Sequence, residues 1–245
     1  MVQVVGGHMK YKVVFEDNHI LVINKEVGML SQADISQVED VLSYYKEYLK
    51  NKYNKPGNVY LGLVHRLDRN VGGLMVLAKT SKAASRLSEQ VRTHKLKKYY
   101  LAITTNQPSI GYYKDYLYKN NNENKSYISN KNQGKLAELE VIDYIQTNNF
   151  YCSLIALFTG RHHQIRVQFA SRKTPLYGDL KYNKDTKKDQ QIALYACGLS
   201  FYHPITKEQL FFNSFSNNYP FNLFEKNQLS LINSLNKYHN HVDTI

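Results

Sequence analysis

Short apolar runs separated by polar residues recur along most of the chain and predict β-strands. The runs at 11–15 and 20–24 are rich in β-branched and aromatic residues, and the polar Glu16-Asp17-Asn18 between them is typical of an antiparallel strand pair. Further runs of strand character lie at 59–64, 74–78, 99–104, 136–145, 151–158, 192–202 and 209–213. A sheet of many short strands is therefore expected.

Two segments have the spacing of an amphipathic helix instead. Ser36 and Glu39 form a capping box, and the apolar residues after them predict a helix over 37–51. Thr80 or Ser81 can cap a second helix. Its apolar face would consist of Ala83, Leu87 and Val91. Strands and helices that are mixed in this way predict an α+β fold.

The rest of the pattern bears on domain organisation. Residues 119–134 are rich in Asn, Lys and Ser and are expected to form a mobile loop between two strands. Residues 1–8 differ in character from the rest of the chain and are interpreted as an extension or a tag ahead of Met9. Residues 9–245 are expected to form a single α+β domain, with a mixed, largely antiparallel sheet flanked by helices. The pattern leaves the role of the tail 225–245 open.

Charge adds a partner class to this picture. The chain of 245 residues has 32 Lys and Arg against 20 Asp and Glu, a formal net charge of +12. A polyanionic partner such as nucleic acid is indicated, unless the surface is merely basic throughout, so the placement of the charges must decide. Cys152 and Cys197 lie in apolar stretches without a CxxC pattern and predict buried free thiols. No apolar run has the length of a membrane span, and a cytoplasmic protein is expected.

The segment 65–73 carries the first candidate chemistry. Asp68 lies between Arg66 and Arg69, directly after an apolar strand and just before a glycine pair that permits an abrupt turn. A carboxylate beside cationic groups stays ionised, as a nucleophile or a general base must. An ion pair at a strand end is the alternative interpretation of this segment alone.

Two basic segments come later in the chain. In 159–170, cationic and amide side chains alternate with apolar ones, which suits phosphate binding and carboxylate pairing by arginine, although an ordinary basic helix face would have the same composition. The adjacent His162 and His163 lack metal-ligand spacing with any nearby Cys or acid, so no metal site is expected. In 95–100, tyrosines are interleaved with lysines, which suits phosphate contacts and base stacking. Strand alternation predicts that Tyr99 and Tyr100 face opposite ways.

Taken in order, these motifs resemble those of the RluA-type RNA pseudouridine synthases, the group that includes RluA, RluC and RluD. The resemblance rests on His65-Arg66-Leu67-Asp68, Lys98-x-Tyr100, Thr159-Gly160-Arg161-x-His163-Gln164-Ile165-Arg166, Pro175-Leu176-x-Gly178-Asp179 and His203-Pro204. The chain departs from the family pattern at Val71-Gly72, where Thr-Ser is usual, and at Gln168 and Tyr195, where histidines are usual. None of these departures affects Asp68.

The resemblance implies isomerisation of specific uridines in structured RNA, either ribosomal RNA of the large subunit or transfer RNA, without a cofactor or a metal. Asp68 would be the catalytic carboxylate, Arg166 would pair with it and Tyr100 would lie against the uracil. Arg66 would either fill the space that the flipped base leaves or bind phosphate. The remaining RNA-binding candidates are His65, Arg69, Lys98, Arg161, His163, Gln164 and Ile165.

A monomer is the default expectation. The catalytic domain is expected to bind RNA by itself, because the few residues before the first strand leave no room for the S4-like domain of some relatives. Two other functions would fit parts of the pattern. A catalytically inactive RNA-binding module would keep the same charges, and an Asp-dependent nuclease would require several carboxylates around a metal ion.

Overall fold

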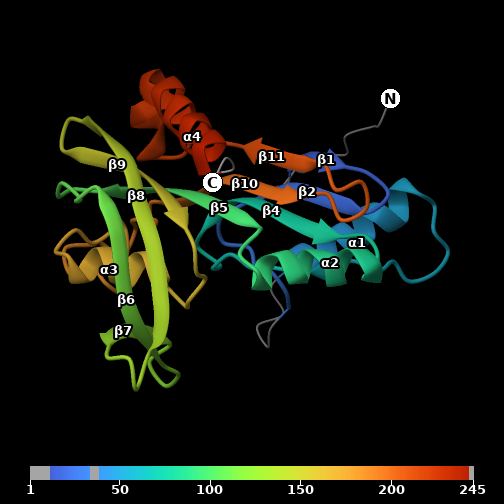
Figure 1. Ribbon diagram of the computed structural model, residues 1–245, viewed down its shortest axis with the longest axis horizontal. Helices are drawn as coiled ribbons and strands as arrows, with labels where there is room; N and C mark the ends of the chain where they lie inside the picture. The colour runs from blue at the N-terminus through green and yellow to red at the C-terminus, as the bar shows by residue number, and fades with distance from the viewer. Residues whose placement is uncertain (1–11, 34–38, 243–245) are drawn as a thin grey trace.

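The computed structural model describes residues 12–33 and 39–242, which form an α+β domain built on one mixed sheet (Figure 1). The helical segments are α1 (Val41–Lys52), α2 (Ser81–Arg92), α3 (Gln164–Ser171), η1 (Phe221–Asn227) and α4 (Gln228–Val242). The strands are β1 (Lys12–Glu16), β2 (Ile20–Lys25), β3 (Gly62–Leu63), β4 (Gly72–Ala78), β5 (Lys97–Thr104), β6 (Gly111–Asn120), β7 (Lys125–Ser129), β8 (Lys135–Thr147), β9 (Phe150–Leu157), β10 (Leu194–Tyr202) and β11 (Gln209–Asn213). The predicted fold class is confirmed, and none of the described residues forms an S4-like domain.

The strands follow the order β1-β2-β4-β10-β5-β9-β8-β6-β7, with β11 beside β10 and β3 beside β4. Only β4 and β10 pair in parallel among the described strands, so the expectation of a largely antiparallel sheet is also confirmed. Strands β6, β7 and β8 extend away from the rest of the sheet as an arm, and α3 lies against this arm (Figure 1). No described helix is long and apolar enough to cross a bilayer.

The helix caps confirm part of the sequence prediction and correct the rest. Thr80 caps α2 as expected, since its hydroxyl accepts the Ala83 N–H at 3.1 Å. Helix α1 begins at Val41 instead of residue 37, because the Asp40 carboxylate accepts the N–H groups of the first turn. Ser36 of the expected capping box lies outside the described residues.

One strand prediction and one loop prediction were wrong. The apolar run 59–64 contributes only Gly62 and Leu63 to the sheet. The polar stretch 119–134 contains β7, which pairs with β6 in an antiparallel hairpin at the sheet edge. Exposed strands at an edge carry polar side chains on both faces, so their composition alone resembles that of a loop. Most of the described part of the tail, whose role the sequence leaves open, forms α4 against the sheet.

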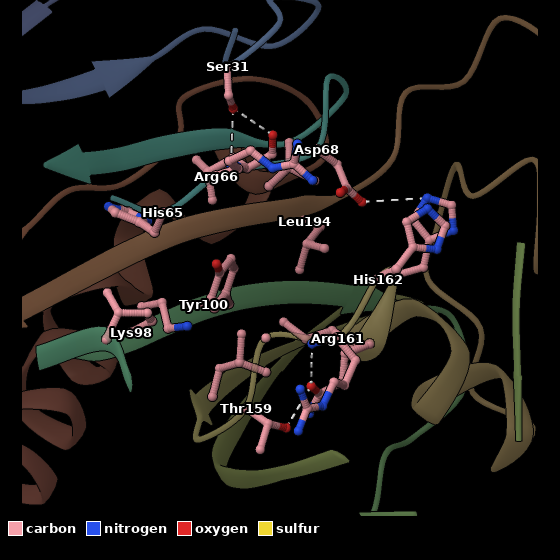
Figure 2. Close-up of a pocket in the computed structure, with 18 of the residues that line it drawn as sticks. Ser31, His65, Arg66, Asp68, Lys98, Tyr100, Thr159, Arg161, His162 and Leu194 are labelled. Atoms are coloured by element: carbon pink, nitrogen blue, oxygen red, sulfur yellow. Dashed lines mark hydrogen bonds and ion pairs between the residues drawn. The ribbon is translucent and has the colours of Figure 1, made fainter. Parts of the chain in front are cut away.

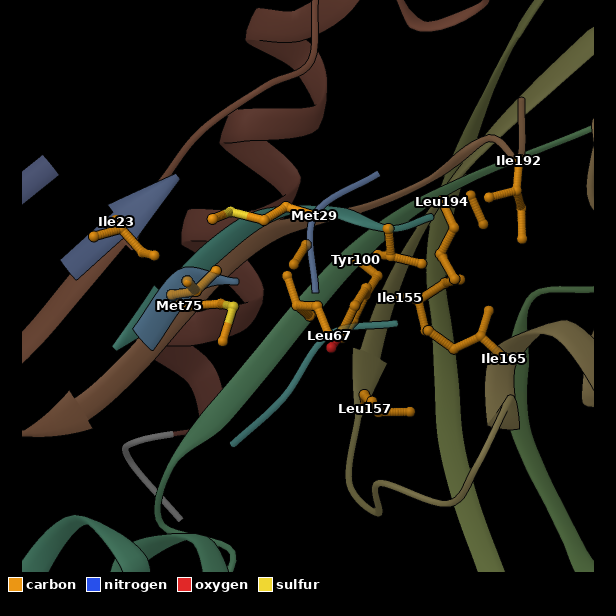
Figure 3. Close-up of a cluster of buried hydrophobic side chains, with 14 of the residues drawn as sticks. Ile23, Met29, Leu67, Met75, Tyr100, Ile155, Leu157, Ile165, Ile192 and Leu194 are labelled. Atoms are coloured by element: carbon orange, nitrogen blue, oxygen red, sulfur yellow. The ribbon is translucent and has the colours of Figure 1, made fainter. Parts of the chain in front are cut away.

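Burial on the two faces of β5 separates the tyrosine pair. Tyr100 belongs to the largest core cluster, together with Leu67, Ile165 and Leu194 (Figure 3). Tyr99 packs in a different cluster on the opposite face, under α4, where its hydroxyl contacts His239 at 3.2 Å. Strand alternation therefore predicted the two faces correctly. Cys152 and Cys197 are buried free thiols, as expected.

An ion cluster fastens the end of α1 to β1. The Glu16 carboxylate accepts bonds from Lys52 at 2.6 Å, Lys79 at 2.7 Å and the Tyr53 hydroxyl at 2.7 Å. Burial alone would raise the pKa of Glu16, but these bonds prevail and lower it to about 2. The ionised form of Glu16 is therefore stabilised by folding.

Candidate active site

A cleft of about 950 Å³ lies where the loop after β3, the start of β5 and the segment from β9 to α3 converge (Figure 2). Every residue that the sequence proposed for catalysis or RNA binding lines this cleft. They come from three motifs that are far apart along the chain, so the tertiary fold brings the predicted set together. Further lining residues that the sequence did not indicate include Ser31, His94, Leu157 and Leu194.

The Asp68 loop is held in place by the segment after β2. Ser31 Oγ donates to Leu67 O at 2.8 Å and accepts the Leu67 N–H at 3.2 Å. The buried Lys25 ammonium donates to Arg69 O at 3.2 Å and to Met29 O at 2.9 Å. Burial lowers the pKa of Lys25 to about 8 against the opposing field of the Asp68 carboxylate. Neither Lys25 nor Ser31 was identified from the sequence.

Asp68 presents its carboxylate at the edge of the cleft, with its side chain 38% exposed. Arg166 Nη1 lies 3.5 Å from Asp68 Oδ2, and His163 Nε2 lies 3.7 Å from the same oxygen. The cationic group that was expected beside the carboxylate is therefore present, as an ion pair without a close hydrogen bond.

The close partner of Arg166 is Asp179, which the sequence indicated only as the last residue of the motif Pro175-Leu176-x-Gly178-Asp179. Arg166 Nε and Nη2 donate to the two Asp179 oxygens at 2.8 and 2.7 Å, and the Asp179 side chain is completely buried. Burial opposes the charge of Arg166, but the bonds to Asp179 and the field of Asp68 outweigh it and raise its pKa. This bidentate pair fixes the guanidinium plane and aims the remaining nitrogen at Asp68.

His163 connects Asp68 to Tyr182. Its Nδ1 lies 3.0 Å from the Tyr182 hydroxyl, which itself accepts the Ser126 N–H at 2.7 Å. The tautomer with its proton on Nε2 lets Nδ1 accept the Tyr182 hydroxyl proton and directs the ring N–H toward Asp68, so we assign this tautomer to the neutral imidazole. Burial, assisted by the positive charge of Arg166, lowers the pKa of His163 to about 2 and keeps the ring neutral. Burial also raises the pKa of Tyr182 to about 12.

Tyr100 lines the cleft from β5 and is almost fully buried, at 7% exposed. Burial and the field of the Asp68 carboxylate both raise its pKa. The phenol is therefore protonated at neutral pH and lies close enough to Asp68 to sense its charge.

The other predicted residues lie either at the exposed rim of the cleft or in its buried wall. Arg66 and Arg69 are exposed at the rim, as is Arg161, whose Nε donates to Leu136 O at 2.7 Å. His65 Nε2 accepts the Val76 N–H at 3.0 Å, and burial lowers the pKa of His65 to about 3, assisted by Lys98.

Lys98 itself is desolvated at the cleft wall, and this burial lowers its pKa. Gln164 Oε1 accepts from the Thr159 hydroxyl at 2.8 Å and from the Arg161 N–H at 3.0 Å. His65 and Gln164 thus hold the two loops that form the cleft. The buried Ile165 lies beneath them in the core.

Among the described residues, no group of three or more His, Cys, Asp or Glu side chains is arranged to hold a metal ion. Asp68, a guanidinium at 3.5 Å and a protonated tyrosine are instead assembled around an open cleft with a basic rim. This arrangement suits attack or proton transfer by a carboxylate on a polyanion.

Comparison with known protein families identifies the same family that the sequence motifs resemble. The family model described as RNA pseudouridylate synthase matches residues 19–171, a region that contains the Asp68 loop, β5 and α3. The chain belongs to the RNA pseudouridylate synthase family. Synthases of this family are isomerases that act on RNA, and the sequence-based assignment to it is confirmed.

Curated relatives match most of the chain. The ribosomal large subunit pseudouridine synthase D of Zymomonas mobilis is 32% identical over 83% of this chain and 68% of its own length. The ribosomal large subunit pseudouridine synthase C of Buchnera aphidicola, from Acyrthosiphon pisum, is 30% identical over 79% of this chain and 63% of its own length. The chain thus spans about two thirds of the length of the curated relatives that it matches.

Solved structures confirm the fold. Human RNA pseudouridylate synthase domain containing 4 superimposes with a TM-score of 0.67 at 22% identity, covering 82% of this chain and 87% of that chain. Human RNA pseudouridylate synthase domain containing 1 gives a TM-score of 0.65 at 21% identity, covering 89% of this chain and 88% of that chain.

Proposed function

We propose that this chain isomerises specific uridines in structured RNA to pseudouridine, with Asp68 as the catalytic carboxylate. The observation that carries the proposal is the placement of Asp68 at the mouth of the cleft, 3.5 Å from Arg166 Nη1 and within the electrostatic reach of Tyr100. Membership in the RNA pseudouridylate synthase family supports the same reaction.

The reaction begins with extrusion of the target nucleotide, since a stacked uridine hides its glycosidic bond. Unstacking costs a few kcal/mol, which contacts in the cleft must offset. Arg66, exposed at the rim, is the candidate to fill the vacated space, and a phosphate contact is its other candidate role. Arg69, Lys98 and Arg161 supply further positive charge along the RNA path.

Asp68 then either attacks ribose C1′ or assists cleavage of the glycosidic bond through a glycal-like species. The detached uracil rotates and bonds to C1′ through C5. The C5 proton is lost and N1 gains a proton, so the reaction is an isomerisation. Tyr100, held protonated beside the carboxylate, is the candidate to move a proton at ribose C2′.

The basic rim favours RNA as the partner, and the names of the curated relatives favour ribosomal RNA of the large subunit over transfer RNA. We propose that the isomerisation uses no redox cofactor, because it needs no redox agent. We also propose that the chain acts as a monomer without a bound metal. Two buried free thiols support a reducing compartment such as the cytoplasm.

Tritium release from RNA labelled at uridine C5 tests the proposal, because this hydrogen leaves only when the new carbon bond forms. The substrate is total RNA from cells that lack the protein, labelled with [5-³H]uridine. Wild-type protein is expected to release tritium, whereas Asp68→Asn and Asp68→Ala proteins bind the RNA and release none.

Controls separate loss of chemistry from loss of folding. Thermal unfolding should be within a few degrees of wild type for both variants, because Asp68 is partly exposed and is not the close partner of Arg166. Release by Asp68→Ala would refute the assigned carboxylate. RNA binding without release by the wild-type protein would identify an inactive RNA-binding module instead.

A further inference from the structure

A second pocket, of about 310 Å³, lies between the β6–β7 hairpin and α3, beside the catalytic cleft. One wall comes from 125–128 on β7, and the opposite wall comes from 180–184 and from Val167 and Ala170 of α3. Figure 1 shows β7 and α3 next to each other at the same end of the sheet. The catalytic mechanism uses none of these side chains directly.

Tyr182 lines the second pocket and contacts two residues of the catalytic site. Its hydroxyl contacts His163 Nδ1 at 3.0 Å, and the Arg166 guanidinium lies 5.2 Å from its ring centre. The Lys125 ammonium of the second pocket lies 5.1 Å from the same ring. One aromatic ring therefore contacts both a lysine of the second pocket and the cation that faces Asp68.

The second pocket is strongly cationic. Lys125, Lys181 and Lys184 line it, and no carboxylate oxygen of the described residues lies within 4.0 Å of their ammonium groups. Burial lowers the pKa of Lys181, as do its neighbours Arg166 and Lys125, against the attraction of Asp179 and Asp68. A bound anion would relieve this repulsion.

The same pocket also exposes large apolar and aromatic side chains. Leu180 is 58% exposed, Ile128 is 42% exposed and Tyr127 is 38% exposed. Apolar and aromatic faces beside lysines form the kind of surface on which an unpaired base stacks while its phosphate is bound. The volume is at the lower end of small-ligand pockets, about 300 to 1,000 Å³, and suits one nucleotide better than a duplex.

We propose that this second pocket binds one unpaired nucleotide of the substrate RNA, near the target uridine in sequence. Its base packs on Tyr127 and Leu180, and its phosphate is held by Lys184 and Lys125. The proposal rests on the proposed function, since the RNA that enters the catalytic cleft is the polyanion that passes Tyr182. An extra anchored nucleotide would help to hold the RNA while the target base is extruded.

Two variants in the second pocket test this, each with a matched control on the outer face of α4. Leu180→Ser is paired with Leu229→Ser, because Leu229 is also an exposed leucine, at 68%. Lys184→Ala is paired with Lys237→Ala, because both lysines are exposed. The probe is a fluorescein-labelled 12-nucleotide oligouridylate, and its affinity is measured by anisotropy over a series of salt concentrations.

Lys184→Ala is expected to reduce the slope of log K against log salt by about 0.7, the share of one phosphate contact on a single strand. Leu180→Ser is expected to weaken binding about 5-fold, and to raise KM for tritium release by a similar factor with kcat unchanged. The α4 controls should match the wild-type protein. Unchanged slope and affinity in both pocket variants, or equal losses in the controls, would overturn the proposal.

Photocrosslinking locates the nucleotide independently of these variants. An oligouridylate that carries 4-thiouridine is expected to crosslink to the tryptic peptide 126–131, which contains Tyr127. Crosslinks confined to peptides of the catalytic cleft would count against the pocket. A wild-type protein that binds and crosslinks at Tyr127 but releases no tritium would contradict the proposed function while leaving the nucleotide site intact.

Discussion

The Arg166–Asp179 pair offers the sharpest test of how this site is built. Arg166→Met removes the guanidinium but leaves the Asp179 carboxylate fully buried without its bidentate partner. Breaking a buried pair from one side costs about 3 to 5 kcal/mol. At about 2 to 4 °C per kcal/mol for a chain of this size, Tm should fall by on the order of 10 °C.

The same change should also affect Asp68. Coulomb's law gives about 5 kcal/mol for unit charges 3.5 Å apart at an effective dielectric constant of about 20. Water reaches Asp68, whose side chain is 38% exposed, so screening leaves about half of this value. A loss of about 2.5 kcal/mol of transition-state stabilisation corresponds to about a 70-fold decrease in kcat.

A second substitution separates the two effects. Asp179→Asn removes the orphaned charge and keeps an acceptor for the Lys181 N–H, which the Asp179 side chain accepts at 3.0 Å. In the Arg166→Met/Asp179→Asn protein we expect about 2 kcal/mol of the stability to return, while kcat stays low. The assays are chemical denaturation and tritium release on RNA in which the wild-type protein is active.

Two results would refute this reasoning. Recovery of kcat together with stability in the double variant would mean that Arg166 acts only through folding. A loss of less than about 1 kcal/mol in Arg166→Met alone would mean that the buried Asp179 carboxylate does not depend on its partner.

Three further experiments test other parts of the geometry. Tyr100→Phe should keep RNA affinity and slow tritium release strongly, whereas Tyr99→Phe, on the other face of β5, should leave both near wild type; equal effects would contradict the assignment of faces. Glu16→Gln should lower the free energy of unfolding by about 2 kcal/mol at pH 6 and by almost nothing at pH 2. The lowered pKa of Glu16 gives stability above about pH 4.5, and this stability is lost as pH falls toward about 2. Chemical denaturation at both pH values checks this. Gly73→Ala should lower the free energy of unfolding by at least about 3 kcal/mol, since φ at Gly73 is +120° and an added Cβ would lie 2.3 Å from Ala196 O. Gly28→Ala should lower it by only about 1 kcal/mol, because φ is +92° but nothing lies within 4 Å of the added Cβ. Thermal unfolding measures both changes.

Local patterns in the sequence were sufficient for much of the fold and for the members of the site. Apolar alternation located most strands, Thr80 marked the start of α2, and alternation alone placed Tyr99 and Tyr100 on opposite faces. The segments 65–69 and 159–166 carried the cleft residues within contiguous motifs. These features are readable because each depends on neighbours a few positions away along the chain.

Only the tertiary structure decided how the site residues are held. Lys25 supports the loop of Asp68 from 44 positions away along the chain, and Asp179 rather than Asp68 takes the two close bonds of Arg166. Tyr182 acquires its position from hydrogen bonds with the β7 hairpin and with His163. Such partners are chosen by packing across the sheet and by the need to pair each buried charge, and neither requirement leaves a periodic pattern in the sequence.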